Sequence, residues 1–334
     1  MQTFSRRFFR LAVPNIISNV TVPLVGLADT IMLGHLPQVR FLAGVALASV
    51  IFDYVYWTFG FLRMGTTGTT AQALGRREID EVYRLLYRSL FVALALGTGI
   101  LVLQQPIRQL SFALLSGAPD VEAAGREYFN ARIWGAPAAL CNFVFIGWYL
   151  GREESQNALY MTLIANLSNI VLNYIFLYKM HLQAFGAGLG SMISQYLMLG
   201  LGLWIFYRRK HRIAWRWREI LNWPRISAML QLNFDILVRT LCLISAFALF
   251  TNFSAVLGTG LLVANSILLR ILGFAAYFID GAAFATESLA GIFHGEQNRP
   301  ALQHLLRYAL LWGEIFAFGF IAILLNRAIT GWIP

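Results

Sequence analysis

The first residue in this sequence that could drive a chemical step is a carboxylic acid in an apolar stretch. Asp29 stands within residues 11–33, which are otherwise rich in leucine, isoleucine, valine and alanine. A charge at the centre of a spanning helix costs about 2.5–3.5 kcal/mol on insertion scales, so such residues usually face a cavity and bind protons, ions or substrate. Burial disfavours the charged form of a carboxyl group, which suits proton exchange. The alternative is a structural hydrogen bond near the outer end of the helix.

Three amide side chains, Asn166, Asn169 and Asn173, recur at helical spacing in a later apolar stretch. Asn169 and Asn173 are four residues apart and share one helix face. A polar stripe in a spanning helix must face protein or water rather than lipid. Contacts between helices would explain part of this stripe. We favour a hydrogen-bonded pocket for a proton, an ion or a ligand, because three amides on one face exceed what such contacts need.

Small residues and prolines mark the two helices that would carry these groups. Pro14 and Pro23 lie in the predicted helix of Asp29, where each removes a backbone hydrogen bond and permits a kink. The kink is either a hinge or static. Glycines 186, 188 and 190 precede Ser191, a spacing that favours close helix packing and leaves Ser191 able to donate into the pocket.

Other ionisable or polar residues within predicted spans are candidates for a substrate cavity, a gate or structural pairing. Asp235 and Arg239 are four residues apart and can pair along one helix. Asp280 and Glu287 are seven apart and share a face. The full set of candidates is Asn166, Asp53, Arg63, Gln72, Asp235, Arg239, Asp280 and Glu287.

The elements that must position these groups are transmembrane helices. Hydrophobic residues make up 58% of the 334 residues and charged residues 13%, against about 25% charged in soluble domains. Because a spanning helix needs about 20 apolar residues, we expect an all-α polytopic membrane protein. The nine predicted spans are 8–33, 43–73, 84–104, 127–150, 158–178, 184–207, 230–255, 261–290 and 303–326.

The charge between these spans sets the expected orientation. With the N-terminus inside, the inner segments hold 17 basic residues and the outer segments 5, as expected for a cytoplasmic N-terminus in the cytoplasmic membrane. Residues 208–229 are basic and rich in tryptophan. A regulatory or nucleic-acid segment is one interpretation, but we favour an amphipathic segment lying on anionic membrane lipids. We expect no nucleic-acid partner, because the net charge of +10 is spread in short clusters.

No motif of an enzyme or an ATP-driven pump is present. There is no Walker sequence, no nucleophile elbow and no zinc-binding HExxH. Cys141 and Cys242 have neither metal nor redox spacing. We therefore expect no catalytic residue, no metal and no cofactor.

A weak internal repeat divides the chain into two lobes. Gly65, Ala71, Gln72 and Gly75 have counterparts at 281, 287, 288 and 291, and residues 84–90 resemble residues 304–310, so the offset drifts from 216 to 220. Chance likeness between apolar helices is the alternative. The predicted division is an N-terminal lobe of six spans at 1–207, a cytoplasmic loop at 208–229 and a partial C-terminal lobe of three spans at 230–334.

Several of these stretches resemble a known family. Residues 14–16, 22–24, 26–30 and 34–36 (PNI, VPL, GLADT, GHL) are similar to the first helix of MATE (multidrug and toxic compound extrusion) transporters. Residues 61–68 and 70–72 (FLRMGTTG, TAQ) resemble the second helix of the DinF-type branch. Residues 232–235 with Arg239 (LNFD), and residues 276–281 and 285–287 (AYFIDG, ATE), resemble its seventh and eighth helices.

The resemblance implies a fold of twelve helices in two lobes around a central cavity, of which this sequence lacks the last three. It implies antiport, in which amphipathic compounds leave as protons or sodium ions enter. It matches Asp29 to the coupling acid of the first helix, Asn169 and Asn173 to its partners, and Ser191 to a hydroxyl of the sixth helix. Many relatives carry an acid where this chain has Asn173, and a sodium-binding branch has a glutamate near the apolar Leu241. The first departure would make proton coupling rest more heavily on Asp29, and the second weakens the case for sodium.

Three functions are therefore weighed. The first is a monomeric proton-coupled antiporter that exports small amphipathic, drug-like compounds across the cytoplasmic membrane. The second is a flippase for lipid-linked precursors, which would need a cationic cavity that Arg63, Arg239 and Arg270 could line. The third is a truncated paralogue or fragment that does not transport, or a membrane scaffold.

Overall fold

The computed structural model describes residues 2–115, 117–209 and 222–325, and every regular element in these ranges is a helix. The all-α prediction is therefore confirmed for this part of the chain. The helices are α1 (Gln2–Gly34), α2 (Val39–Thr58), α3 (Phe61–Gly75), α4 (Ile79–Val102), α5 (Gln104–Leu114), α6 (Pro119–Arg132), η1 (Ile133–Gly135), α7 (Ala136–Gly151), α8 (Ser155–Tyr174), η2 (Ile175–Lys179), α9 (Gln183–Arg209), α11 (Trp223–Leu257), α12 (Thr259–Gly295) and α13 (Arg299–Leu325).

Eight described segments are long and apolar enough to cross a membrane, which confirms an integral multi-pass protein. They are Phe4–Gly34, Val39–Gly75, Ile79–Val102, Pro119–Gly151, Ser155–Lys179, Gln183–Arg208, Phe234–Ser254 and Arg299–Ala322. The remaining predicted span, 261–290, lies inside α12, which is not one of these eight.

The helices depart from the predicted layout in three places. The predicted span at 43–73 lies within one candidate membrane segment, Val39–Gly75, but its helix is interrupted at Phe59 and Gly60, where the Gly60 amide donates to the Trp57 carbonyl in a turn (3.1 Å) and separates α2 from α3. The additional helix α5 follows α4. Residues 210–221 of the predicted loop lie outside the described residues, but 223–229 already belong to α11. This helix starts early because the Asn222 side chain accepts from the Arg225 amide (3.3 Å) and Pro224 occupies the first turn, where no amide is needed.

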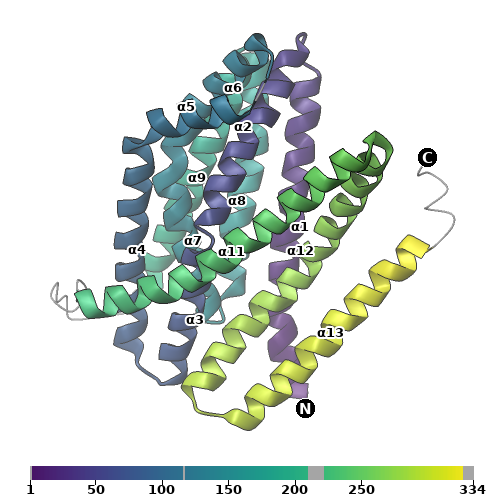
Figure 1. Cartoon of the computed structure of the whole chain (residues 1–334). Coiled ribbons are helices and arrows are strands. Elements are labelled where there is room, and N and C mark those ends of the chain that lie inside the picture. The colour runs from purple at the N-terminus through teal and green to yellow at the C-terminus, as the bar shows by residue number, and fades with distance from the viewer. Residues whose placement is uncertain (1, 116, 210–221, 326–334) are drawn as a thin grey trace.

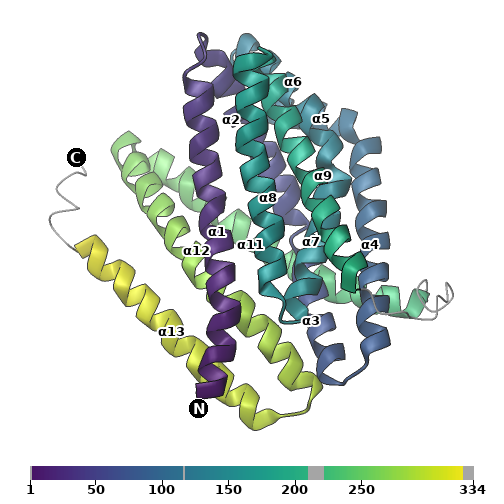
Figure 2. The ribbon, with the colours of Figure 1, turned by 180° about the vertical axis from the view of Figure 1, so that it is seen from behind.

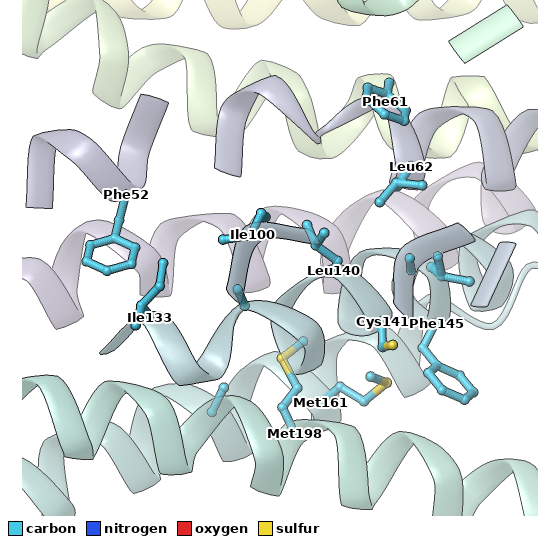
Figure 3. Close-up of a cluster of buried hydrophobic side chains, with 14 of the residues drawn as sticks. Phe52, Phe61, Leu62, Ile100, Ile133, Leu140, Cys141, Phe145, Met161 and Met198 are labelled. Atoms are coloured by element: carbon cyan, nitrogen blue, oxygen red, sulfur yellow. The ribbon is translucent and has the colours of Figure 1, made fainter. Parts of the chain in front are cut away.

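The first large group of helices packs around α7. Thirteen of the 16 residues of α7 are buried, so this helix is the centre of the bundle, where it packs on α3, α4, α8 and α9 (Figures 1 and 2). Helices α2 and α6 pack on each other, and α6 joins the bundle through α9. Figure 3 shows part of its apolar core, in which Leu140 and Phe145 of α7 lie among side chains from neighbouring helices such as Phe52, Ile133 and Met161. Burial of these side chains supplies the packing that membrane helices need in place of a hydrophobic drive between them.

Helix α1 lies between this bundle and the oblique helices α12 and α13, as Figure 2 shows. Its N-terminal half packs on α12 and α13: Phe8 and Leu11 are buried in a separate apolar cluster with Leu289 and Phe293 of α12 and Leu305 of α13. Its C-terminal half packs on α8. A change in the shape of α1 therefore bears on both groups at once.

Turns of one kind follow α3, α7 and α12, and those after α3 and α12 lie at the end of the molecule that also holds the N-terminus (Figure 1). Arg77 after α3 and Gln297 after α12 both have positive φ, 61° and 55°, and they are 220 residues apart. In each turn the next amide donates to the carbonyl five residues earlier, which closes the helix end in the same way. These bonds run from Glu78 to Ala73 (3.0 Å) and from Asn298 to Phe293 (2.9 Å).

The two repeats also pack on each other reciprocally. A Cβ on Gly75 would collide with the Ile292 carbonyl, and a Cβ on Gly295 would collide with the Gln72 carbonyl. Gly295 and Ile292 are the counterparts of Gly75 and Gln72 at the same offset of 220, so a pseudo-twofold axis relates α3 to the end of α12. This contact supports the internal repeat and sets its offset here at 220 rather than 216. The division into lobes at 208–229 remains a prediction.

Candidate functional site

A chain of hydrogen bonds joins Asp29 of α1 to α8 and α9. Asn173 Nδ2 donates to Asp29 Oδ1 (2.8 Å) and to Asn169 Oδ1 (3.2 Å), and Asn169 Nδ2 donates to Ser191 Oγ (3.2 Å). Both asparagines are buried, whereas Asp29 and Ser191 are half-buried. The four residues predicted as the coupling site are thus neighbours in space, although their role stays a prediction.

The glycine at 190 explains how Asn173 fits between α8 and α9. A Cβ at this position would occupy the place of the Asn173 carboxamide oxygen. Gly188, two residues earlier, approaches the Tyr128 carbonyl of α6 so closely that a Cβ would meet it at 2.6 Å. The small residues of α9 therefore serve close packing, as predicted. Asn173 Oδ1 is buried and accepts no hydrogen bond from any described residue, which leaves one acceptor free inside the site.

Two more hydrogen bonds tie α1 to α8 and its continuation. Asn166 Nδ2 donates to Thr21 Oγ1 (2.7 Å), on the N-terminal side of Asp29. The Tyr178 hydroxyl donates to the Met32 carbonyl (2.7 Å), on the C-terminal side. Tyr178 was not among the predicted site residues. It lies five residues after Asn173, which is not a helical spacing, so the sequence carries no signal for it.

The prolines do not break α1, which continues as one helix through Pro14 and Pro23. Pro23 lacks the amide that would donate to the Asn19 carbonyl. At this point α1 changes neighbours, because Asn19 Nδ2 donates to the Tyr277 carbonyl of α12 (3.3 Å) whereas Thr21 accepts from α8. The missing bond thus lies between the part of α1 held by α12 and the part held by α8. A hinge at Pro23 remains a prediction.

Arg132, at the end of α6, is a second residue that the sequence reasoning left out of the site. Its Nη1 donates to the Tyr128 hydroxyl (2.6 Å), and its guanidinium stacks over the Phe52 ring at 4.5 Å. Its charge acts at longer range on Asp29 and Asp53, and it makes no ion pair within 4 Å among the described residues. A lone arginine near the end of a predicted span gave no reason to expect these interactions.

An ion pair links α3 to α12. Arg63 Nη1 lies 3.3 Å from Glu287 Oε2, and the Arg63 guanidinium stacks on the Phe284 ring at 3.9 Å. The Arg63 side chain is 13% exposed, so its charge is largely enclosed and paired. The cationic cavity expected for a flippase therefore does not include a free Arg63. The side chain of Arg270 lies outside what the structure describes.

Asp235 and Arg239 make no ion pair within 4 Å, so the pairing that their spacing allows is not formed in this structure. Both side chains are exposed, and Arg239 Nη2 instead approaches Met64 Sδ of α3 at 3.8 Å. Asp53 of α2 and Asp280 of α12 are also exposed and both act electrostatically on Tyr277. Gln72 contributes its backbone to the glycine contact described above.

Comparisons with known proteins agree with this architecture. Residues 14–175 match the MatE family. The chain is 34% identical over 323 residues to DNA damage-inducible protein F of Escherichia coli (strain K12), an alignment that covers 96% of this chain and 70% of that protein. It is 22% identical over 319 residues to the probable multidrug resistance protein NorM of Thermotoga maritima, covering 93% of this chain and 68% of that protein.

Solved structures show the same fold. A crystal structure of MATE in complex with MaD3S has a TM-score of 0.83 at 26% identity, covering 96% of this chain and 73% of that one. A MOP superfamily transporter from Pyrococcus furiosus has a TM-score of 0.85 at 24% identity, covering 95% and 70%, which shows the fold alone. On these grounds the chain belongs to the MATE family of integral membrane transporters, in its DinF-type branch, and is a transporter rather than an enzyme.

Proposed function

We propose that this protein exports small amphipathic organic compounds across the cytoplasmic membrane in exchange for protons, with Asp29 as the proton-binding group. The hydrogen bond from Asn173 to Asp29 is the observation that carries the proposal, because its strength depends on the charge of the carboxyl group. The similarity to the probable multidrug resistance protein NorM of Thermotoga maritima supports the substrate class.

Protonation would change what Asp29 can do with its neighbour. The charged carboxylate accepts from Asn173 Nδ2, whereas a protonated carboxyl group offers a donor. The free acceptor Asn173 Oδ1 suits that second state if the amide turns over. The same pair thus has two arrangements, one for each protonation state, and each holds the C-terminal half of α1 differently.

The attachment of α1 supplies a route from this change to the rest of the protein. Its C-terminal half is held by α8 through Asn166 and Asn173, and its N-terminal half is packed on α12 and α13. The missing backbone bond at Pro23 lies between the two halves. A ligand can shift such an equilibrium only by binding the two states differently, and a proton on Asp29 does so.

Two exposed carboxyl groups on α2 and α12 support a cationic, amphipathic substrate. Asp53 of α2 and Asp280 of α12 are exposed within apolar helices, where an acid must face water or protein rather than lipid. Tyr277 of α12 lies within electrostatic range of both carboxylates. Carboxylates near an aromatic ring suit cations with apolar bodies.

The orientation follows from the ends of the helices. Arg7 of α1 pairs with Glu153 after α7, and Arg225 of α11 pairs with Glu81 of α4 (2.8 Å), so basic residues gather at the end that carries the N-terminus. By the positive-inside rule we assign this end to the cytoplasm.

The test measures efflux from proteoliposomes that contain the purified protein, across which a proton gradient is imposed. With ethidium as substrate, we expect Asp29→Asn to lower the initial rate at least tenfold while the protein remains folded by size-exclusion chromatography. Asp120→Asn, an exposed acid in the first turn of α6, serves as the matched control and should transport as the unaltered protein does. Unchanged efflux by Asp29→Asn would refute the proposal, and efflux driven only by a sodium gradient would refute proton coupling.

A further inference from the structure

The continuation of α8 is a π-helix, η2, which starts two residues after Asn173. In it the Met180 amide donates to the Ile175 carbonyl (3.0 Å), five residues earlier. Segments of π-helix are rare and are found disproportionately at functional sites. This one directly adjoins the residue that binds Asp29.

The π-helix turns Tyr178 toward α1. In an α-helix a side chain five residues after Asn173 would lie about 140° away around the axis, because each residue advances by about 100°. Bonding from i to i+5 adds roughly one residue to the turn, so Tyr178 comes to stand on the same side as Asn173. Asn166, seven residues before Asn173, shares that side as well. The three residues consequently form a row that faces α1.

The acceptor of Tyr178 is a carbonyl at the end of α1 that lacks its α-helical partner. The Leu36 amide would serve Met32 in an α-helix, but it donates to the Leu33 carbonyl instead (3.2 Å). The last carbonyls of a helix need partners from outside it. The Tyr178 hydroxyl supplies one for Met32 at 2.7 Å.

This bond lies less than one helical turn beyond Asp29. With the bond from Asn166 to Thr21 on the other side, it brackets the Asp29 carboxylate between two fixed points on α8 and η2. Rotation of the α1 end away from η2 would carry the carboxylate away from Asn173. The depth and rotation of Asp29 are thus set in part by a residue that does not touch it.

We propose that Tyr178 is a positioning residue for Asp29, which holds the last turn of α1 against η2 so that the carboxylate meets Asn173. This inference rests on the proposed function, since it concerns the same site. It adds that the π-helix is present to place this hydroxyl.

The test compares Tyr178→Phe with Tyr174→Phe in the full chain. Tyr174 lies one turn earlier, its ring centroid is 5.5 Å from that of Tyr178, and its hydroxyl makes no hydrogen bond among the described residues. Hydrogen–deuterium exchange of residues 30–36 is followed in nanodiscs. We expect Tyr178→Phe to speed exchange there about five-fold, the factor supplied by one ordinary hydrogen bond, and Tyr174→Phe to change nothing.

A double-mutant cycle with Asp29→Asn separates positioning from mere stabilisation. Each variant changes the exchange rate of residues 30–36 by some factor. If Tyr178 positions Asp29, the factor measured for the double variant will differ at least two-fold from the product of the factors for Tyr178→Phe and Asp29→Asn. In ethidium efflux, Tyr178→Phe should lower kcat several-fold with KM unchanged, because the dye does not bind at η2.

Unchanged exchange in Tyr178→Phe, effects that multiply, or an unaltered kcat would each overturn the inference. The proposed function fails separately, when the unaltered protein shows no proton-driven efflux or Asp29→Asn keeps it. The exchange cycle then still decides whether Tyr178 positions the Asp29 turn, because it does not depend on transport.

Discussion

Asn173 Nδ2 lies 2.8 Å from Asp29 Oδ1, and this contact is the point at which α8 holds the C-terminal half of α1. The Asn173 carboxamide can occupy this place only because residue 190 of α9 has no side chain. A buried amide between a carboxylate and a glycine has little freedom to move elsewhere. The site is consequently sensitive to single methyl groups.

Gly190→Ala should therefore disrupt the site. The new Cβ would collide with the Asn173 carboxamide, push it off Asp29 and leave buried polar groups unpaired, at a cost of about 1–3 kcal/mol. We expect a lower thermal unfolding temperature and loss of efflux.

Gly200→Ala is the control for this change, because it lies in the same helix and its Cβ would have nothing within 4 Å. Equal stability and efflux in the two variants would show that Asn173 does not depend on the space at residue 190.

The pair of Arg63 with Glu287 should couple the two lobes. Because the two side chains are 13% and 26% exposed, Arg63→Gln and Glu287→Gln should each destabilise the fold by about 1–2 kcal/mol, below the 3–5 kcal/mol of a fully buried pair. The double variant should lose less than the sum of the two, as measured by thermal unfolding in detergent.

An exposed pair on one helix offers a comparison for that cycle. Arg126→Gln should have little effect, since its partner Glu122 lies four residues away on the surface of α6. Additive losses at Arg63 and Glu287 would mean that the two do not interact in the membrane.

Replacing either Gly75 or Gly295 by alanine should lower the stability of the fold to a similar extent. Gly75→Ala and Gly295→Ala each place a methyl group against the backbone of the opposite helix, so we expect both to destabilise the fold by about 1–3 kcal/mol through overpacking. Thermal unfolding of the purified variants measures this effect.

Gly68→Ala, in the same helix as Gly75, has open space around its Cβ and should have no such effect. If only one of Gly75→Ala and Gly295→Ala lowered the stability of the fold, the two contacts between α3 and α12 would not be equivalent.

Much of the helical layout could be predicted because its causes are local. Apolar length sets where a helix spans the membrane, and a carboxyl group such as Asp29 stands out against that background. The stripe of Asn169 and Asn173 was predictable for the same reason, because a spacing of four residues fixes a common face whatever packs against it. The family resemblance added which partners to expect for Asp29, and the structure brings them together.

The remaining features depend on residues far apart in the chain. The possible pair of Asp235 with Arg239 follows a rule for isolated helices, yet Arg239 approaches Met64 of another helix instead. Arg63 found its partner 224 residues away, at Glu287. No local pattern specifies such choices, because the free energy of an ion pair depends on which groups share its surroundings.

The sequence by itself determined that the protein is a bundle of membrane helices with an acid and a polar stripe inside it, since hydropathy and helical period are properties of each segment. Only the tertiary structure decided that α1 is shared between α8 and α12, and that a π-helix brings Tyr178 to the Met32 carbonyl. The reason is that packing between segments decides both where a helix changes to π-helical bonding and which helix becomes its neighbour.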